Sequence, residues 1–306
     1  MMRKSEKKFN GVIVPMVTPL TADDRIDTDA VAAIMQKLYE AGANPFVLGT
    51  TGESVSVPAS GKLQLVDAVM DQKMSGMTVY AGISGTCLQE SVMQAQLFAE
   101  RGVDAVVAHL PFYFPLSPEH ILKYFLQLAD LVPVPLIIYN NPITVKQSVP
   151  IDVAEQLSYH SNIAGLKDSE RGLERLDLSL KLWKSRPDFS FLVGWSTQSA
   201  YSVLNGSDGI VPSSGNFMPK LYQNIYDSAL QGDSTNAFEY QEKADRISDI
   251  YLKDKNISHS IPALKYLMSL YGLCQPCVFS PLAEPDQRTK SAIREQAGAI
   301  TGLNDI

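Results

Sequence analysis

Short apolar runs rich in β-forming residues alternate with longer segments of helical spacing along this chain of 306 residues. The helical segments place apolar residues three or four positions apart, as in Val31, Ile34, Met35 and Leu38. Strict alternation of strand and helix is typical of parallel strands joined by crossover helices. Eight such units fit an α/β fold of the closed (β/α)8 TIM barrel type better than a doubly wound sheet. The predicted strands are residues 11–17, 45–48, 78–81, 105–108, 136–139, 163–166, 189–193 and 209–211.

The alternation stops after the eighth predicted strand. Three helical segments are predicted there, near residues 221–230, 234–252 and 261–270, and no linker-like stretch separates them from the barrel. We therefore predict a barrel over residues 1–224 and a C-terminal helical extension over residues 225–306 that packs on it.

Composition and charge exclude several classes of function. A formal net charge of −7 argues against nucleic acid as a partner, because phosphate binding needs a basic face. No apolar segment approaches the roughly 20 residues of a membrane span, and the N-terminus lacks the apolar core of a signal peptide. The expected compartment is therefore the cytoplasm. Three cysteines form no disulfide framework, and Cys274 and Cys277 form a lone C-x-x-C motif without the further ligands of a metal site, although a redox role stays open.

Lys167 stands at the carboxyl end of the predicted strand 163–166. Active sites of TIM barrels lie at the carboxyl ends of the strands. An amine with little water around it has a lowered pKa, so its free form can attack a ketone and form a Schiff base. The alternative is a structural lysine that pairs with Asp168 or reaches solvent.

Two further strand ends bear polar groups. The motif Gly49-Thr50-Thr51-Gly52-Glu53 follows the second strand, where its backbone N–H groups and hydroxyls can bind a carboxylate or phosphate; a tight turn is the alternative. Tyr139 ends the fifth strand, where it can relay a proton or serve as a core aromatic. The aromatic loop 111–115 after the fourth strand is either a pocket wall or a subunit contact.

The ordered set Gly49-Thr50-Thr51-Gly52-Glu53, Tyr139-Asn140-x-Pro142 and Gly165-Leu166-Lys167 resembles the dihydrodipicolinate synthase and N-acetylneuraminate lyase family over nearly the whole chain. The resemblance implies a class I lyase or aldolase that needs no metal or other cofactor and acts on pyruvate or another 2-oxo acid and an aldehyde. Lys167 would form the Schiff base, and Tyr139 would exchange protons through Thr50 with Tyr113 of a neighbouring subunit. A homotetramer, built as a dimer of dimers, is implied as well. The substrate-binding residues would be Thr50, Thr51, Gly52, Thr144, Val211 and Ser213.

One position departs from the synthase pattern. That pattern has an arginine two residues after the proline of Tyr-Asn-x-Pro, where this chain has Thr144, and a hydroxyl cannot grip a second carboxylate as a guanidinium does. Lys146 lies close in sequence and could partly replace the arginine. We therefore expect a sugar-derived 2-oxo acid as the substrate. The alternatives are 4-hydroxy-tetrahydrodipicolinate synthase using aspartate semialdehyde, a Schiff-base dehydratase of a deoxy-oxo sugar acid, a barrel that binds phosphate at Ser213 and Ser214, and a non-catalytic oxo-acid-binding homologue.

Overall fold

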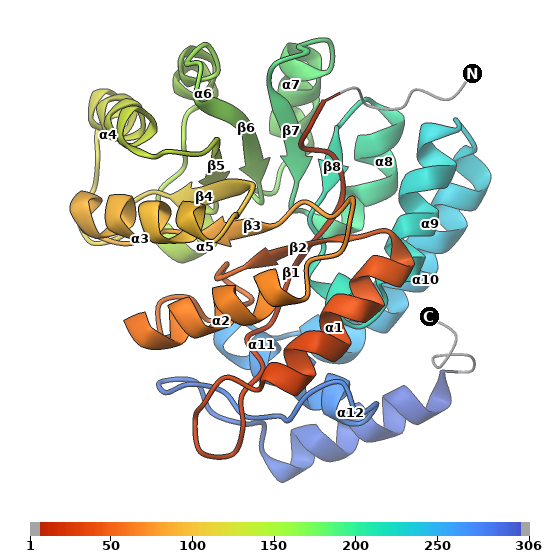
Figure 1. The fold of residues 1–306 in the computed structure, drawn as a ribbon. Helices are drawn as coiled ribbons and strands as arrows, with labels where there is room; N and C mark the ends of the chain where they lie inside the picture. The colour runs from red at the N-terminus through yellow and green to blue at the C-terminus, as the bar shows by residue number, and fades with distance from the viewer. Residues whose placement is uncertain (1–6, 301–306) are drawn as a thin grey trace.

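The computed structural model describes residues 7–300 and confirms the TIM barrel (Figure 1). Eight parallel strands close in chain order, and β1 pairs with both β2 and β8. The strands are β1 (Gly11–Pro15), β2 (Asn44–Val47), β3 (Tyr80–Gly82), β4 (Ala105–His109), β5 (Leu136–Asn140), β6 (Ile163–Asp168), β7 (Ser190–Val193) and β8 (Gly209–Ile210).

Helices surround the barrel and follow the strands as the sequence predicted. Helix α1 illustrates the local signals: the side chain of Asp27 accepts a hydrogen bond from Ala30 N, and Gly42 ends the helix with a φ of 78°. The segments outside the sheet are α1 (Thr28–Ala41), α2 (Ala59–Asp71), α3 (Leu88–Glu100), α4 (Pro118–Leu131), α5 (Pro142–Val145), α6 (Ile151–Leu157), α7 (Leu173–Trp183), the 3-10 turn Ser196–Gln198, α8 (Ser199–Leu204), the 3-10 turn Ser213–Asn216, α9 (Pro219–Leu230), α10 (Ser234–Leu252), α11 (Ile257–Ser269) and α12 (Gln287–Ala299).

Two apolar cores fill the molecule. One lies between the strands and the helices, and the other fills the barrel interior with side chains such as Phe46, Tyr80 and Ile137. Successive side chains of a strand point to opposite faces. Tyr139 therefore belongs to the interior core, whereas Asn140 bonds to groups outside the barrel wall.

The helical extension packs on the barrel through α10, which contacts α8, α9, α11 and α12 (Figure 1). Helix α12 was not predicted, because it buries only Ile293 and Ala297 and so has almost no apolar stripe. The predicted boundary at residues 224 and 225 falls within α9, the helix that follows β8, and we propose that the extension begins after Leu230. Between residues 7 and 300, no helix is both long and apolar enough to cross a membrane.

Candidate active site at the carboxyl ends of the strands

Lys167 is buried at the carboxyl end of β6, with 4% of its surface exposed. Its Nζ lies 3.8 Å from the centre of the Tyr139 ring and 4.7 Å from that of Phe46. Asp168 does not pair with it, because that carboxylate accepts from Arg175 Nε at 2.8 Å. Burial lowers the pKa of Lys167, although Tyr139 opposes the shift. The amine is thus closer to its neutral, nucleophilic form at neutral pH than an exposed lysine.

Tyr139 lies beside Lys167 because β5 and β6 pair with these two residues in register. Its Oη lies 3.3 Å from Thr50 Oγ1 and accepts a hydrogen bond from Asn141 Nδ2 at 2.9 Å. Burial raises the pKa of Tyr139, but the charge of protonated Lys167 and the hydrogen bond with Thr50 outweigh it, so the pKa lies below its ordinary value. A phenol with these neighbours can exchange a proton with a group bound at Lys167.

The loop after β2 brings Thr50 and Thr51 to the same cavity as Lys167. It turns tightly, with Gly52 N donating to Gly49 O at 3.1 Å and Glu53 N donating to Thr50 O at 3.1 Å. A Cβ on Gly52 would lie 2.9 Å from Met16 O, so only glycine fits this close approach of two backbone segments. The loop thus presents hydroxyls, the donors that a carboxylate needs.

A cavity of about 420 Å³ joins these groups. Of the predicted site residues, it brings together Lys167, Tyr139, Thr50, Thr51, Val211 and Ser213. Further hydroxyl-bearing side chains line it: Ser169, Ser196 and Thr197. Residues of α10 and α11 also line it, so the C-terminal extension helps to enclose the cavity.

The other predicted residues lie elsewhere in the single chain. Gly52 supports the loop through its carbonyl, which accepts from Thr18 Oγ1 at 2.6 Å. Thr144 donates to Asn141 O at 3.1 Å and lines an adjoining hollow of about 380 Å³, which also includes Thr50. Tyr113 is 76% exposed and packs edge-on against Phe114.

Ser214 contradicts the proposed phosphate site at Ser213 and Ser214. Its hydroxyl is fully buried and bonds to Ser248 and Tyr251 of α10, at 2.6 and 2.7 Å. Ser213 also contacts the Tyr251 hydroxyl, at 2.8 Å. Because both hydroxyls bond to α10 and Ser214 is fully buried, the pair cannot present two free donors to a phosphate.

Asn141 and Arg171 line the cavity but were not predicted as site residues. Asn141 was visible within the motif Tyr139-Asn140-x-Pro142, at the position that the motif leaves free. Arg171 follows Lys167 by four residues in an irregular segment, so nothing in the sequence indicated the direction of its side chain. Lys146, the suggested substitute for the missing arginine, is exposed and donates to Ile143 O at 2.9 Å.

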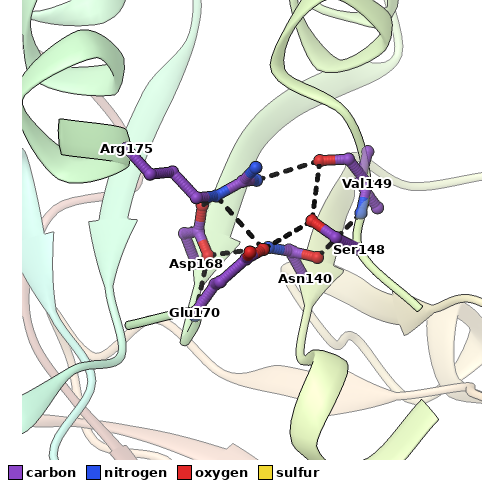
Figure 2. A network of polar contacts seen from close by, with 6 residues as sticks. All are labelled: Asn140, Ser148, Val149, Asp168, Glu170 and Arg175. Atoms are coloured by element: carbon purple, nitrogen blue, oxygen red, sulfur yellow. Dashed lines mark hydrogen bonds and ion pairs between the residues drawn. The ribbon is translucent and has the colours of Figure 1, made fainter. Parts of the chain in front are cut away.

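A polar network lies on the outer side of the two strands that bear Tyr139 and Lys167 (Figure 2). Asn140 Nδ2 donates to Asp168 Oδ1 at 2.9 Å and to Glu170 Oε2 at 2.8 Å. Arg175 binds Asp168 through Nε and reaches Val149 O through Nη2 at 3.0 Å. The network thereby ties the ends of β5 and β6 to each other and to the segment that precedes α6.

Replacing Arg175 should destabilise the folded protein, because this network contains the buried carboxylate of Asp168. Burial raises the pKa of Asp168, and Arg175 is the charge that opposes the shift. Arg175→Met leaves a buried carboxylate uncompensated, so we expect the free energy of unfolding to fall by about 3 kcal/mol in urea titrations at neutral pH. The deficit should shrink as the pH falls. Without Arg175 the pKa of Asp168 in the folded variant is higher than in the folded wild type, so the variant takes up the proton first and loses its uncompensated charge.

Arg246→Met is the matched control for Arg175→Met. Arg246 pairs with Glu242 at 2.6 Å, but both side chains are about 70% exposed, at 72% and 68%. Such a surface pair is worth at most about 1 kcal/mol. Equal losses of stability in the two variants would contradict the role assigned to Arg175.

The cysteines and metal-binding side chains offer no second centre in the described part of the chain. Residues 7–300 contain no group of three or more His, Cys, Asp and Glu side chains placed to hold a metal ion. Cys274 and Cys277 are free thiols, and burial raises the pKa of Cys274 to about 12. A thiol with so high a pKa is a poor redox nucleophile.

Comparisons with known proteins agree with this geometry. The model of the "Dihydrodipicolinate synthetase family" matches residues 8–300. The putative 2-dehydro-3-deoxy-D-gluconate aldolase YagE of Escherichia coli K12 is 30% identical, over 94% of this chain and 97% of that protein. A solved dihydrodipicolinate synthase from Bacteroides thetaiotaomicron is 31% identical with a TM-score of 0.90, over 96% of this chain and 99% of that one. The structure of YagE from E. coli K12 in complex with pyruvate has 27% identity and a TM-score of 0.89, over 96% and 100% of the two chains.

Proposed function

The chain belongs to the dihydrodipicolinate synthetase family and is a carbon–carbon lyase, and from this premise we propose that it cleaves or forms a bond between pyruvate and a sugar-derived aldehyde. The observation that supports this most directly is the buried Lys167 amine, held 3.8 Å from the Tyr139 ring in a cavity that also contains Thr50 and Thr51. A nucleophilic amine, a proton carrier and hydroxyl donors are the three groups that a Schiff-base mechanism requires.

In the proposed reaction, Lys167 Nζ attacks the ketone carbon of the oxo acid while Thr50 and Thr51 hold its carboxylate. Tyr139 protonates the hydroxyl of the resulting carbinolamine, and water leaves to give the iminium ion. In the cleavage direction, Tyr139 then removes the proton of the C4 hydroxyl. The C3–C4 bonding electrons move to the iminium, which releases the aldehyde and leaves an enamine. Protonation at C3 and hydrolysis release pyruvate and restore the amine.

We also propose that a second copy of the chain completes the site. Tyr113 lies on an exposed aromatic loop with Phe112 and Phe114, which are 47% and 70% exposed. Phe112 borders the hollow that adjoins Thr50, so a neighbouring subunit that covers this loop could bring its own Tyr113 to Thr50. A homotetramer built as a dimer of dimers is the proposed assembly. The three free cysteines suit the proposed cytoplasmic location.

The substrate proposal depends on the polar side chains that line the cavity and the adjoining hollow. The cavity is lined by the hydroxyl groups of Ser169, Ser196 and Thr197. Thr144, in the adjoining hollow, stands where the synthase pattern has an arginine, and the relative YagE is named as a putative 2-dehydro-3-deoxy-D-gluconate aldolase. Arg171 favours a second candidate, 4-hydroxy-tetrahydrodipicolinate synthase, because its guanidinium could bind the carboxylate of aspartate semialdehyde.

Rates of pyruvate release test the proposal. We expect the protein to release pyruvate from 2-dehydro-3-deoxy-D-gluconate and to condense pyruvate with glyceraldehyde more efficiently than with aspartate semialdehyde. Loss of the sugar acid without pyruvate release would indicate the dehydratase. Formation of the Schiff base without turnover of any of these compounds would contradict the proposal and indicate a homologue that only binds oxo acids.

Thr144→Arg should shift the choice of aldehyde. A charge-assisted hydrogen bond is worth about 1.5–3 kcal/mol, against about 0.5–1.5 kcal/mol for a neutral one. We expect the ratio of kcat/KM for aspartate semialdehyde to that for glyceraldehyde to rise about tenfold, as measured with each aldehyde at saturating pyruvate. Thr144→Val is the control, since it removes the hydroxyl without adding a charge. A wild type that already prefers aspartate semialdehyde would refute the substrate proposal, and Arg171→Ala would then show whether Arg171 replaces the missing arginine.

A further inference from the structure

We propose that Lys265, in the C-terminal extension, is a positioning residue for the loop that binds the substrate carboxylate. This inference rests on the proposed role of Thr50 and Thr51. Lys265 lies on α11 and is completely buried, as is the side chain of its partner Glu53. Its Nζ donates to Glu53 Oε1 and to Thr18 O, each at 2.8 Å.

The loop is held from behind by this buried cluster, which consists of Thr18, Glu53, Lys265 and Phe279. The second carboxylate oxygen of Glu53 accepts from Phe279 N at 2.8 Å. Thr18 Oγ1 donates to Gly52 O at 2.6 Å, while the Thr18 carbonyl accepts from Lys265. Lys265 and Phe279, both in the C-terminal extension, thus bind the loops that follow β1 and β2 within one cluster.

Glu53 needs such support because its backbone is unfavourable. Its φ of 55° lies in the left-handed region, where residues other than glycine are strained. Such a conformation persists only where the surroundings fix it. The bonds from Lys265 and Phe279 fix the carboxylate of Glu53, and Glu53 N in turn donates to Thr50 O. The place of Thr50 in the cavity therefore depends on contacts made outside the cavity.

Lys265 itself does not reach the cavity, whereas its neighbours Ile261 and Leu264 line it. Its charge is neutralised by Glu53, so it would act through geometry rather than on the reacting atoms. This predicts an effect on the binding of the oxo acid with little effect on the chemical step at saturation. A purely structural lysine would change stability alone.

The test compares Lys265→Met with Lys7→Met. Lys7 is a matched control, because it is also largely buried and pairs with Asp208 at 2.7 Å, but at the opposite end of the barrel. Its Nζ likewise donates to a backbone carbonyl, Phe189 O at 2.9 Å. Both variants should lower the midpoint of thermal unfolding.

Borohydride trapping of pyruvate on Lys167 gives the readout. In Lys265→Met, we expect the pyruvate concentration for half-maximal trapping to rise about tenfold to a hundredfold, with the maximal extent unchanged, because small displacements of a binding group are costly. In Lys7→Met the half-maximal concentration should stay within about twofold of the wild type, since a distant site is independent. An unchanged value in Lys265→Met, or an equal rise in both variants, would overturn the inference.

If Lys265→Met does not fold, the double variant Glu53→Gln/Lys265→Met removes both buried charges and keeps an acceptor for Phe279 N. Neutral replacement of a buried pair is commonly tolerated. Without the bridge to Thr18, this variant should also need more pyruvate, and a folded double variant with the wild-type value would overturn the inference. Wild-type protein that traps no pyruvate at Lys167 would instead refute the proposed function.

Discussion

Lys167→Met should abolish turnover, with kcat reduced about 10⁴-fold or more. The covalent intermediate requires an amine at this position, and no neighbouring group can substitute for it in the same bond. Methionine keeps most of the apolar stem that carries Nζ to the rings of Tyr139 and Phe46. The fold should therefore survive, and the loss can be assigned to chemistry. Steady-state assays of pyruvate release measure the effect.

The same variant should lose the adduct as well as the rate. Borohydride with pyruvate should reduce a pyruvyl group onto Lys167 of the wild type, as located by peptide mass mapping. Because burial lowers the pKa of Lys167, trapping should continue at pH values where an exposed lysine is almost entirely protonated. Lys181→Met, which removes an exposed lysine of α7, should behave as the wild type. Equal trapping in Lys167→Met would refute the Schiff-base assignment.

Tyr139→Phe should reduce kcat by about 10²- to 10⁴-fold while KM changes little. A general acid or base acts in the transition state, and removing it lowers kcat without weakening substrate binding. The ring that contacts Lys167 is retained, so only the hydroxyl near Thr50 and Asn141 is lost. Full kinetic curves in pyruvate and aldehyde separate the two constants.

Tyr80→Phe is the control for this change. Tyr80 also lies in the barrel interior, and within residues 7–300 its hydroxyl is buried without a hydrogen-bond partner. Removing that hydroxyl should leave kcat unchanged and should not destabilise the fold. A rise in KM alone in Tyr139→Phe would make Tyr139 a wall of the pocket.

The strand ends could be assigned from the sequence because each depends on a local signal. Apolar runs predicted the strands of the barrel, and helical spacing predicted the helices between them. The capping residues of α1, Asp27 and Gly42, are signals of the same local kind. Parallel strands bring their carboxyl ends to one edge. That rule placed Lys167, Tyr139 and the Thr50 loop at one end of the barrel, the family resemblance joined them in one site, and the structure brings them to one cavity. Weak local signals failed, as in α12, where only two residues are buried.

The directions and partners of side chains were decided only by the tertiary structure. Asp168, beside Lys167 in sequence, binds Arg175 because successive strand residues face opposite sides of the barrel wall. Ser214 faces α10 rather than the cavity, although it adjoins Ser213. Lys265 and Glu53 lie 212 positions apart and meet at 2.8 Å. No periodicity encodes such a contact, because it depends on how the extension folds back over the loops. The sequence by itself determined which groups end the strands. The tertiary packing decided what lies behind them: Arg175 binds the strand that bears Lys167, and Lys265 of α11 binds the loop that bears Thr50.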